Sequence, residues 1–357
     1  MTRAEIAEKA DLDIRTAAAY AEELCRAGLA CAVKVPSTSK GRPGNAYKPD
    51  YEKVKSIGLA LTINGVDAVL CDIRGNILRR GGFSVNLESE SKQTVIQKIL
   101  SIITAYTAAA GEDKIAGIGV ALSRWLRPPL SVYDIFEDLA VIINKHVDIP
   151  VFCGLPISVD TYAVRRDYPS YENILVVHPG NVLEFGVQIE GDIPADNRRM
   201  EYEFSHYPVD PEGEKCYCGK IGCLENYVTA SAVVERFRKH SGQAKTFSFS
   251  DFVDRVAAGD VVATKIARQM GTFLWQGVAE SAIRLKMRVV TVFTDCDYVS
   301  ELIMKLYSSG DYPFECVAFD NKRIVTAVAA AEMASFKTVI NYCPQRFCRS
   351  SPIKSTV

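Results

Sequence analysis

The residues best suited to chemistry are three closely spaced cysteines, Cys216, Cys218 and Cys223, with His206 upstream of them. Three thiolates and one imidazole make a Cys3His set, which tetrahedral Zn²⁺ prefers. With four protein ligands the ion keeps no open position for water. The spacing therefore predicts a structural zinc site rather than a catalytic one.

Two glycines, Gly219 and Gly222, lie between these ligands and let the backbone turn tightly enough to aim close thiolates at one metal. The alternative reading is a disulfide or three unrelated thiols. The N-terminus lacks the pattern of a secretory signal, and no apolar run reaches transmembrane length. We therefore expect a cytoplasmic protein with reduced thiols, away from the membrane, which favours metal binding.

The bulk composition limits how the chain can meet a partner. Its 357 residues are 48% hydrophobic, which is enough for two or three domains with their own cores. The 42 Lys and Arg residues balance 43 Asp and Glu residues, so no global charge draws the chain to nucleic acid. Any contact with DNA must come from a local patch.

Residues 1–50 have the pattern of a small DNA-binding module. Thr2 and Glu5 form a capping box for one helix, and Asp13 can cap a second helix that stops at Gly28. Short extended runs at 31–35 and 46–48 flank a turn-rich segment, which predicts a β-hairpin wing. From residue 26 to residue 48 there are five basic residues and no acidic one. Such a patch favours phosphate contacts.

The second helix is the predicted reading element, because residues near the N-terminus of a recognition helix face base edges in the major groove. Wing side chains approach phosphates or the adjacent minor groove. The alternative is a solvated helix on a packing domain. The predicted DNA contacts are Arg15, Thr16, Ala19 and Tyr20 on the helix, and Lys40 and Arg42 on the wing.

The rest of the chain alternates strands with helices, which predicts an α/β layer fold. A linker at 50–55 leads to three antiparallel strands between 57 and 87. Helices at 91–109 and 132–146 alternate with strands at 115–122 and 150–153. The second half repeats this pattern, with strands at 173–178, 183–190 and 288–293 and helices at 230–241, 260–286 and 323–334. We predict two lobes, 51–155 and 156–340, and a flexible tail at 341–357.

The metal-site segment resembles a known family signature. Glu203-Phe-Ser-His206, followed by Cys216-Tyr-Cys-Gly-Lys-Ile-Gly-Cys-Leu-Glu225, is similar to the zinc motif of the repressor, open reading frame, kinase (ROK) family, with Ser205 in place of a glycine. Thr2-Arg-Ala-Glu-Ile-Ala and Gly41-Arg-Pro43 resemble its repressor branch. The resemblance implies a winged helix-turn-helix before an actin-like (ribonuclease H-like) duplicated α/β domain. Because the sequence begins almost at the capping box, we expect the family's first helix of this module to be missing, either because the start codon was assigned too late or because the DNA-binding core is incomplete.

Several motifs of the family's kinases are changed. Ala60, Thr62, Ile63 and Asn64 stand where the family binds phosphate, and Leu155 and Pro156 stand where it has its catalytic Asn-Asp pair. Neither Leu nor Pro can accept a proton. The glycine-rich turn at 180–186, the nucleotide-side Gly-Gly at 294–295 and the sugar loop at 120–122 are also replaced. The resemblance therefore implies a pseudokinase, which is a kinase-like domain without kinase activity. The alternative is that Asp160 replaces the missing catalytic base.

The resemblance also implies a regulatory role. Glu203, His206 and Glu225 contact or adjoin sugar hydroxyls in the family, so a sugar or sugar-derived effector is expected, although both carboxylates could instead support the zinc loop. We expect a transcriptional regulator that represses carbohydrate-related genes at a double-stranded DNA operator, as a homodimer or higher homo-oligomer. The alternatives are an active sugar kinase and an interaction protein that does not bind DNA.

Overall fold

The computed structural model describes residues 1–35, 45–62, 65–84, 90–122, 132–194, 198–242, 246–318 and 326–342. The chain divides into two compact units. The first unit holds residues 1–162 and 325–357, and the second unit holds residues 163–324. Both combine helices with a sheet, so the predicted α/β class is confirmed.

The predicted N-terminal helices and hairpin form as expected. The elements are α1 (Arg3–Ala10), α2 (Ile14–Arg26), β1 (Ala30–Lys34) and β2 (Asn45–Pro49). The Thr2–Glu5 capping box is present, and the Asp13 carboxylate accepts from the backbone N–H groups of Arg15 and Thr16 in α2. The strands β1 and β2 pair antiparallel. Lys40 and Arg42, at the predicted tip of the wing, lie outside the described residues.

The core of this module is small, and polar contacts supplement it. Ala17 and Ala21 of α2 pack inward, and Tyr47 of β2 is only 7% exposed. Arg3 Nε donates to Tyr47 Oη at 3.0 Å, and Arg3 Nη2 donates to Glu22 Oε1 at 2.6 Å. One arginine therefore links α1 to both α2 and β2.

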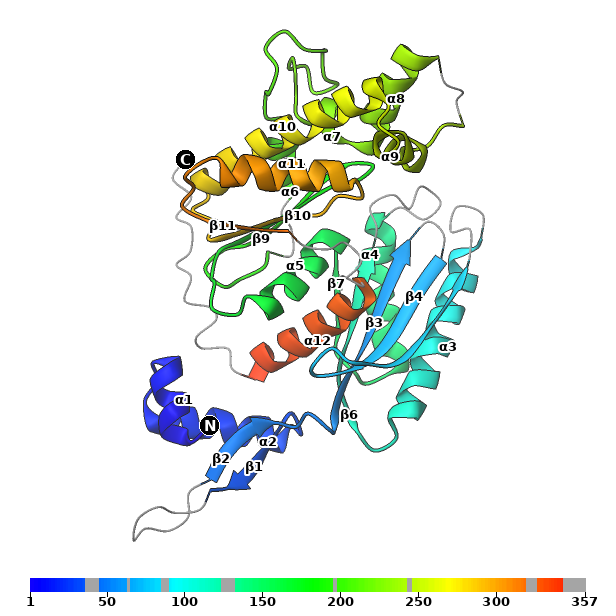
Figure 1. Cartoon of the computed structure of the whole chain (residues 1–357). Coiled ribbons are helices and arrows are strands. Elements are labelled where there is room, and N and C mark those ends of the chain that lie inside the picture. The colour runs from blue at the N-terminus through cyan, green and yellow to red at the C-terminus, as the bar shows by residue number, and fades with distance from the viewer. Residues whose placement is uncertain are drawn as a thin grey trace. The chain divides into compact units, whose positions relative to one another are not determined.

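The sheet of the first unit has the order β5-β4-β3-β6-β7. Its strands are β3 (Val54–Thr62), β4 (Gly65–Asp72), β5 (Ile77–Ser84), β6 (Lys114–Leu122) and β7 (Val151–Gly154). The first three are antiparallel as predicted, and β6 and β7 run parallel. Helices α3 (Lys92–Ala110), α4 (Val132–His146) and α5 (Pro156–Asp167) follow strands of this sheet (Figure 1).

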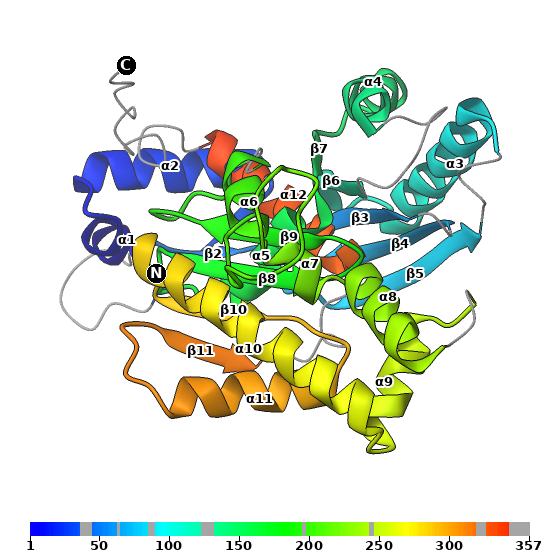
Figure 2. The same cartoon turned by 90° about the horizontal axis from the view of Figure 1, so that it is seen from above.

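The last helix, α12 (Thr326–Tyr342), packs on β3 and β6 of this sheet, so its assignment to the second lobe was wrong (Figure 2). Glycines let the backbones approach. A Cβ added at Gly58 would lie 1.7 Å from the Ala327 carbonyl oxygen, and one at Gly119 would lie 1.8 Å from that of Ala330. Alanines on the helix and glycines on the strands together allow this contact.

The prediction of a linker at 50–55 is also wrong. The Val54 N–H donates to the Asp50 carbonyl at 3.0 Å, closing a turn that leads directly into β3. Val54 is fully buried beside Leu29, and Leu24 of α2 and Val339 of α12 pack against the same cluster. We name this cluster the joint. Through the joint, residues 1–50 pack against the rest of the first unit and are not connected to it by a flexible linker alone.

The sheet of the second unit has the order β11-β10-β8-β9. The strands are β8 (Ile174–Pro179), β9 (Leu183–Gln188), β10 (Val289–Val292) and β11 (Glu315–Ala318). The helices are α6 (Arg198–Ser205), α7 (Glu225–Val228), α8 (Ala230–Ser241), α9 (Phe249–Ala257), α10 (Val261–Arg284) and α11 (Asp297–Ser308). The long α10 buries Met270, Leu274 and Val278 completely. Within the described residues, no helix combines the length and apolar character needed to cross a membrane.

Candidate functional site

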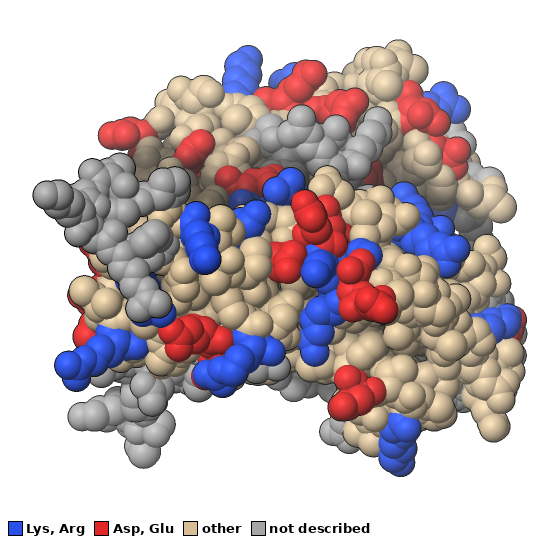
Figure 3. Space-filling view, turned by 90° about the horizontal axis from the view of Figure 1, so that it is seen from below, with Lys and Arg blue, Asp and Glu red and all other residues tan. Residues whose placement is uncertain are grey.

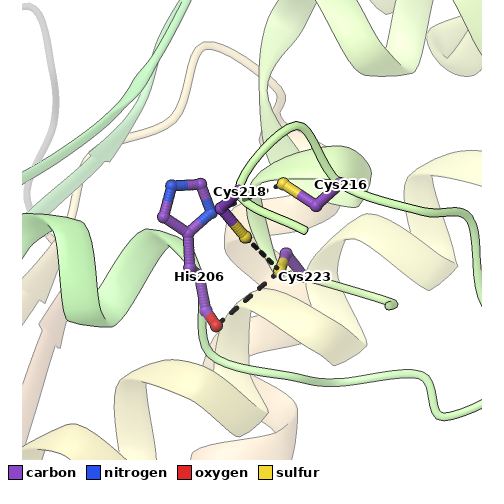
Figure 4. A group of neighbouring side chains, drawn as sticks. All are labelled: His206, Cys216, Cys218 and Cys223. Carbon is purple, nitrogen blue, oxygen red and sulfur yellow. Dashed lines mark hydrogen bonds between the residues drawn. The ribbon is translucent and has the colours of Figure 1, made fainter. Parts of the chain in front are cut away.

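The four predicted metal ligands converge in the second unit. His206 directly follows α6, and the three cysteines lie on the loop between it and α7. One ligand atom from each residue lies within 4.8 Å of the others. His206 Nδ1 is 3.5 Å from Cys216 Sγ, and Cys218 Sγ is 3.6 Å from Cys223 Sγ. Figure 4 shows one ring nitrogen facing the sulfur atoms and the other pointing away.

These distances suit a tetrahedral ion. Zn–S bonds of about 2.3 Å place tetrahedral ligand atoms about 3.8 Å apart. The observed separations of 3.5 and 3.6 Å are close to this value. Both separations are therefore compatible with ligands of one metal ion, within a cluster whose ligand atoms all lie within 4.8 Å of one another.

The loop backbone depends on both glycines between the ligands. Gly219 has φ 93° and Gly222 has φ 64°, in the left-handed region that side chains disfavour. A Cβ at Gly222 would also lie 1.6 Å from the Asp210 carbonyl oxygen. The Asp210 carboxylate in turn accepts from Tyr227 Oη at 2.8 Å. The predicted role of the glycines is thus confirmed, and Asp210 and Tyr227 add support that the sequence pattern did not reveal.

Burial sets the protonation of the metal-free ligands. Cys223 is fully buried, and this raises the pKa of its thiol to about 12. Burial also raises the pKa of Cys216 and lowers that of His206, where the carboxylate of Glu225 opposes the shift. A neutral imidazole is ready to ligate, whereas the buried thiols of Cys216 and Cys223 need a cation to ionise. The three sulfur atoms and the imidazole therefore form a donor set that fits a divalent metal with a preference for soft ligands.

The predicted effector residues are only partly brought together. Glu225 Oε2 lies 3.8 Å from His206 Nδ1 and has no hydrogen-bond partner. His206 Nε2 is also buried without a partner. Glu203 instead accepts from Arg199 on the surface of α6 at 3.2 Å. Two unsatisfied polar atoms thus lie beside the metal ligands, and Glu203 is not joined to them.

Two tyrosines flank the same imidazole, and the sequence analysis missed both. The centroid of the Tyr202 ring lies 4.3 Å from the centroid of the His206 ring, and the centroid of the Tyr217 ring lies 5.0 Å from it. Tyr217 is 80% exposed. The available signals were the spacing of Tyr202 four residues before His206 on a helix and the position of Tyr217 between two ligands.

The predicted DNA-contact residues on α2 differ in exposure. Arg15 and Ala19 are exposed, whereas Thr16 and Tyr20 are half-buried. The Thr16 hydroxyl donates to the Asp13 carboxylate, so it completes the cap of the helix. Figure 3, which views the molecule from below, shows Lys and Arg interspersed with Asp and Glu across the described surface.

At several of the positions corresponding to kinase motifs, the structure places apolar or ion-paired side chains. Leu155 precedes α5, and Pro156 is its first residue, where a missing N–H costs nothing. Ala60 and Leu122 are buried in β3 and β6. In the glycine-rich turn, the Glu184 carboxylate lies 3.2 Å from His178 Nδ1. Ile63 and Asn64 lie outside the described residues.

The chain combines an N-terminal helix-turn-helix and hairpin with two α/β units and a Cys3His loop. Together these features define the class of kinase-like α/β proteins that carry an N-terminal helix-turn-helix. The chain belongs to the ROK family, whose sequence profile matches residues 57–307.

A repressor and a dual transcriptional regulator are among the proteins similar in sequence. The xylose repressor of Bacillus spizizenii is 21% identical over 290 residues, covering 78% of this chain and 74% of the repressor. The DNA-binding transcriptional dual regulator NagC of Escherichia coli is 21% identical over 301 residues, covering 78% of this chain and 73% of the regulator.

Solved structures share the fold. A ROK family transcriptional regulator, described as a homolog of the E. coli MLC protein, has a TM-score of 0.75 at 18% identity and covers 96% of this chain and 93% of its own. The ROK hexokinase of Thermus thermophilus has a TM-score of 0.65 at 18% identity and covers 80% of this chain and 99% of its own. The predicted winged helix-turn-helix and actin-like ROK domain are thereby confirmed as the fold.

Proposed function

We propose that this chain is a cytoplasmic ROK-type transcriptional regulator that represses carbohydrate-related genes. Its N-terminal module binds a double-stranded operator, and its kinase-like domain is inactive and senses an effector. The observation that carries the proposal is the combination of a formed helix-turn-helix with apolar residues at the β7–α5 junction, where a kinase needs its base. The similar repressors support this reading.

In the proposed mechanism, α2 enters the major groove and the wing approaches the backbone. Arg15 and Ala19 are exposed for base edges, while Arg26, Lys34 and Lys48 expose positive charge for phosphates. A homodimer presents two such modules to a two-fold symmetric operator. Repression follows because the bound dimer occupies the operator.

The metal in this proposal is a structural Zn²⁺ held by His206 Nδ1 and the three cysteine thiolates. When bound, it would fix the loop and compensate the thiolate charges. His206 Nε2 and Glu225 Oε2 are both buried without a hydrogen-bond partner, and Oε2 lies 3.8 Å from Nδ1 of the same imidazole. An effector with neighbouring hydroxyls would satisfy both atoms, because a hydroxyl donates and accepts. A sugar or sugar-derived molecule has this chemistry.

The test is a selection of bound fragments from a random DNA pool, repeated at low and high salt. A regulator is expected to enrich one two-fold symmetric sequence whose binding survives competitor DNA. Recovery of no preferred sequence at any salt would contradict the proposal. A coupled ATPase assay across a sugar panel tests the kinase alternative, and sugar-dependent ATP consumption would reverse the assignment.

A further inference from the structure

The outward side of α2 carries one continuous ridge. Arg15, Ala19, Glu22 and Arg26 are all exposed. Their spacing of four, three and four residues places them on one face of the helix. Ala17 and Ala21 are buried on the opposite side. The ridge therefore points away from the module core, where a nucleic acid groove can reach it.

Glu22 is the only acidic residue of this ridge. A carboxylate facing phosphates opposes binding, because DNA is densely negative. Here Arg3 compensates the charge, with Nη2 at 2.6 Å from Glu22 Oε1. The two side chains are 44% and 52% exposed, so the pair lies at the surface.

Arg3 is also fixed on its other side. Its Nε donates to Tyr47 Oη at 3.0 Å, and its guanidinium carbon lies 5.8 Å from the centre of that ring. The Met1 amino group donates to the Tyr47 carbonyl at 2.8 Å. The cation that neutralises Glu22 is thus anchored to β2, close to the wing.

We propose that Arg3 is a positioning residue for DNA recognition, which cancels the charge of Glu22 on the exposed ridge of α2 and fixes that carboxylate relative to β2. The inference rests on the proposed DNA-binding function. Exposed ion pairs contribute little to folding. The effect of this pair is therefore expected mainly where phosphates approach the ridge.

The experiment measures the affinity of the full chain for a mixed-sequence DNA duplex over a salt series. Arg3→Met is expected to weaken binding about tenfold and to reduce the salt slope by about one. Arg3→Lys retains the charge and is expected to keep most of the affinity. The double variant Arg3→Met/Glu22→Gln is expected to return to within about threefold of the unchanged chain, because the exposed carboxylate is gone.

Controls separate charge from folding. Arg80→Met breaks a comparable exposed pair with Asp67 outside the module and is expected to leave binding unchanged. Tyr47→Phe removes the hydroxyl anchor but keeps the Glu22 pair, and hydrogen exchange of residues 1–35 reports whether the module stays folded. If Glu22→Gln fails to rescue Arg3→Met, or if Arg3→Met binds normally, this inference is overturned while the proposed function stands. If the unchanged chain binds no duplex even at low salt, both are overturned.

Discussion

Replacing Gly119 with alanine is expected to disrupt the packing of α12 on the first sheet. The new Cβ would lie 1.8 Å from the Ala330 carbonyl oxygen, whereas a carbon–oxygen contact normally needs about 3.3 Å. The helix or the strand must therefore move by about 1.5 Å, and such a gap forfeits much of the dispersion energy of the buried face. We expect the free energy of unfolding to fall by about 3 kcal/mol or more.

Gly117→Ala is the matched control, because Gly117 lies on the same strand under the same helix. There the added Cβ would meet Thr338 Oγ1 at 3.0 Å and Ala334 Cβ at 3.2 Å, so the neighbours need to shift only slightly. The reduced entropy of the unfolded chain offsets part of this cost, and the net change is expected to stay within about 1 kcal/mol. Urea unfolding of the full chain measures both variants, and hydrogen exchange of α12 locates the loss. If the two variants have equal urea midpoints, the close approach of Gly119 to Ala330 does not control stability.

Three further outcomes are expected. Cys223→Ser purifies without metal, whereas Cys316→Ala, which removes a buried thiol outside the metal cluster, keeps it; metal analysis distinguishes them. Asp13→Ala removes the cap of α2 and destabilises that helix by about 1 kcal/mol, seen as faster hydrogen exchange of residues 14–26. Burial raises the pKa of Cys316 from 9.0 to about 12; because the folded-state value is the higher one, stability is full below pH 9.0 and falls as the pH rises through about 12. Urea unfolding across this window is expected to show a shallower fall for Cys316→Ala.

The metal cluster could be predicted from the sequence because its ligands are local. Spacing along one loop decides whether Cys216, Cys218 and Cys223 can meet, and glycines at the turns are visible in the same segment. Helix caps at Thr2 and Asp13 were predictable for the same reason, since each cap involves residues within one turn. The orientation of His206, with Nδ1 toward the sulfurs, needed the fold.

Contacts between distant segments were not predictable from local patterns. The C-terminal helix follows the second unit in the chain, so chain order suggested the wrong lobe. The signal that did exist was glycine inside the strands, at Gly58 and Gly119, which marks close backbone approach but does not name the partner. Short helices such as α9 and α11 were missed because a few apolar positions do not establish a helical period. Arg3 was missed because its partners Glu22 and Tyr47 are far away in sequence.

The joint has a consequence for how operators are discriminated. A DNA-binding module on a flexible linker can reorient to suit many half-site spacings. Each binding event must then immobilise the module, at an entropic cost. Here Leu24 and Val339 hold the module in place before any duplex arrives. In the proposed homodimer, the distance between the two recognition helices would then be fixed, and it would select the spacing of the two half-sites. An operator with intact halves but about five inserted base pairs, roughly half a helical turn, would present its second half on the opposite face of the double helix, and the protein could not reach it.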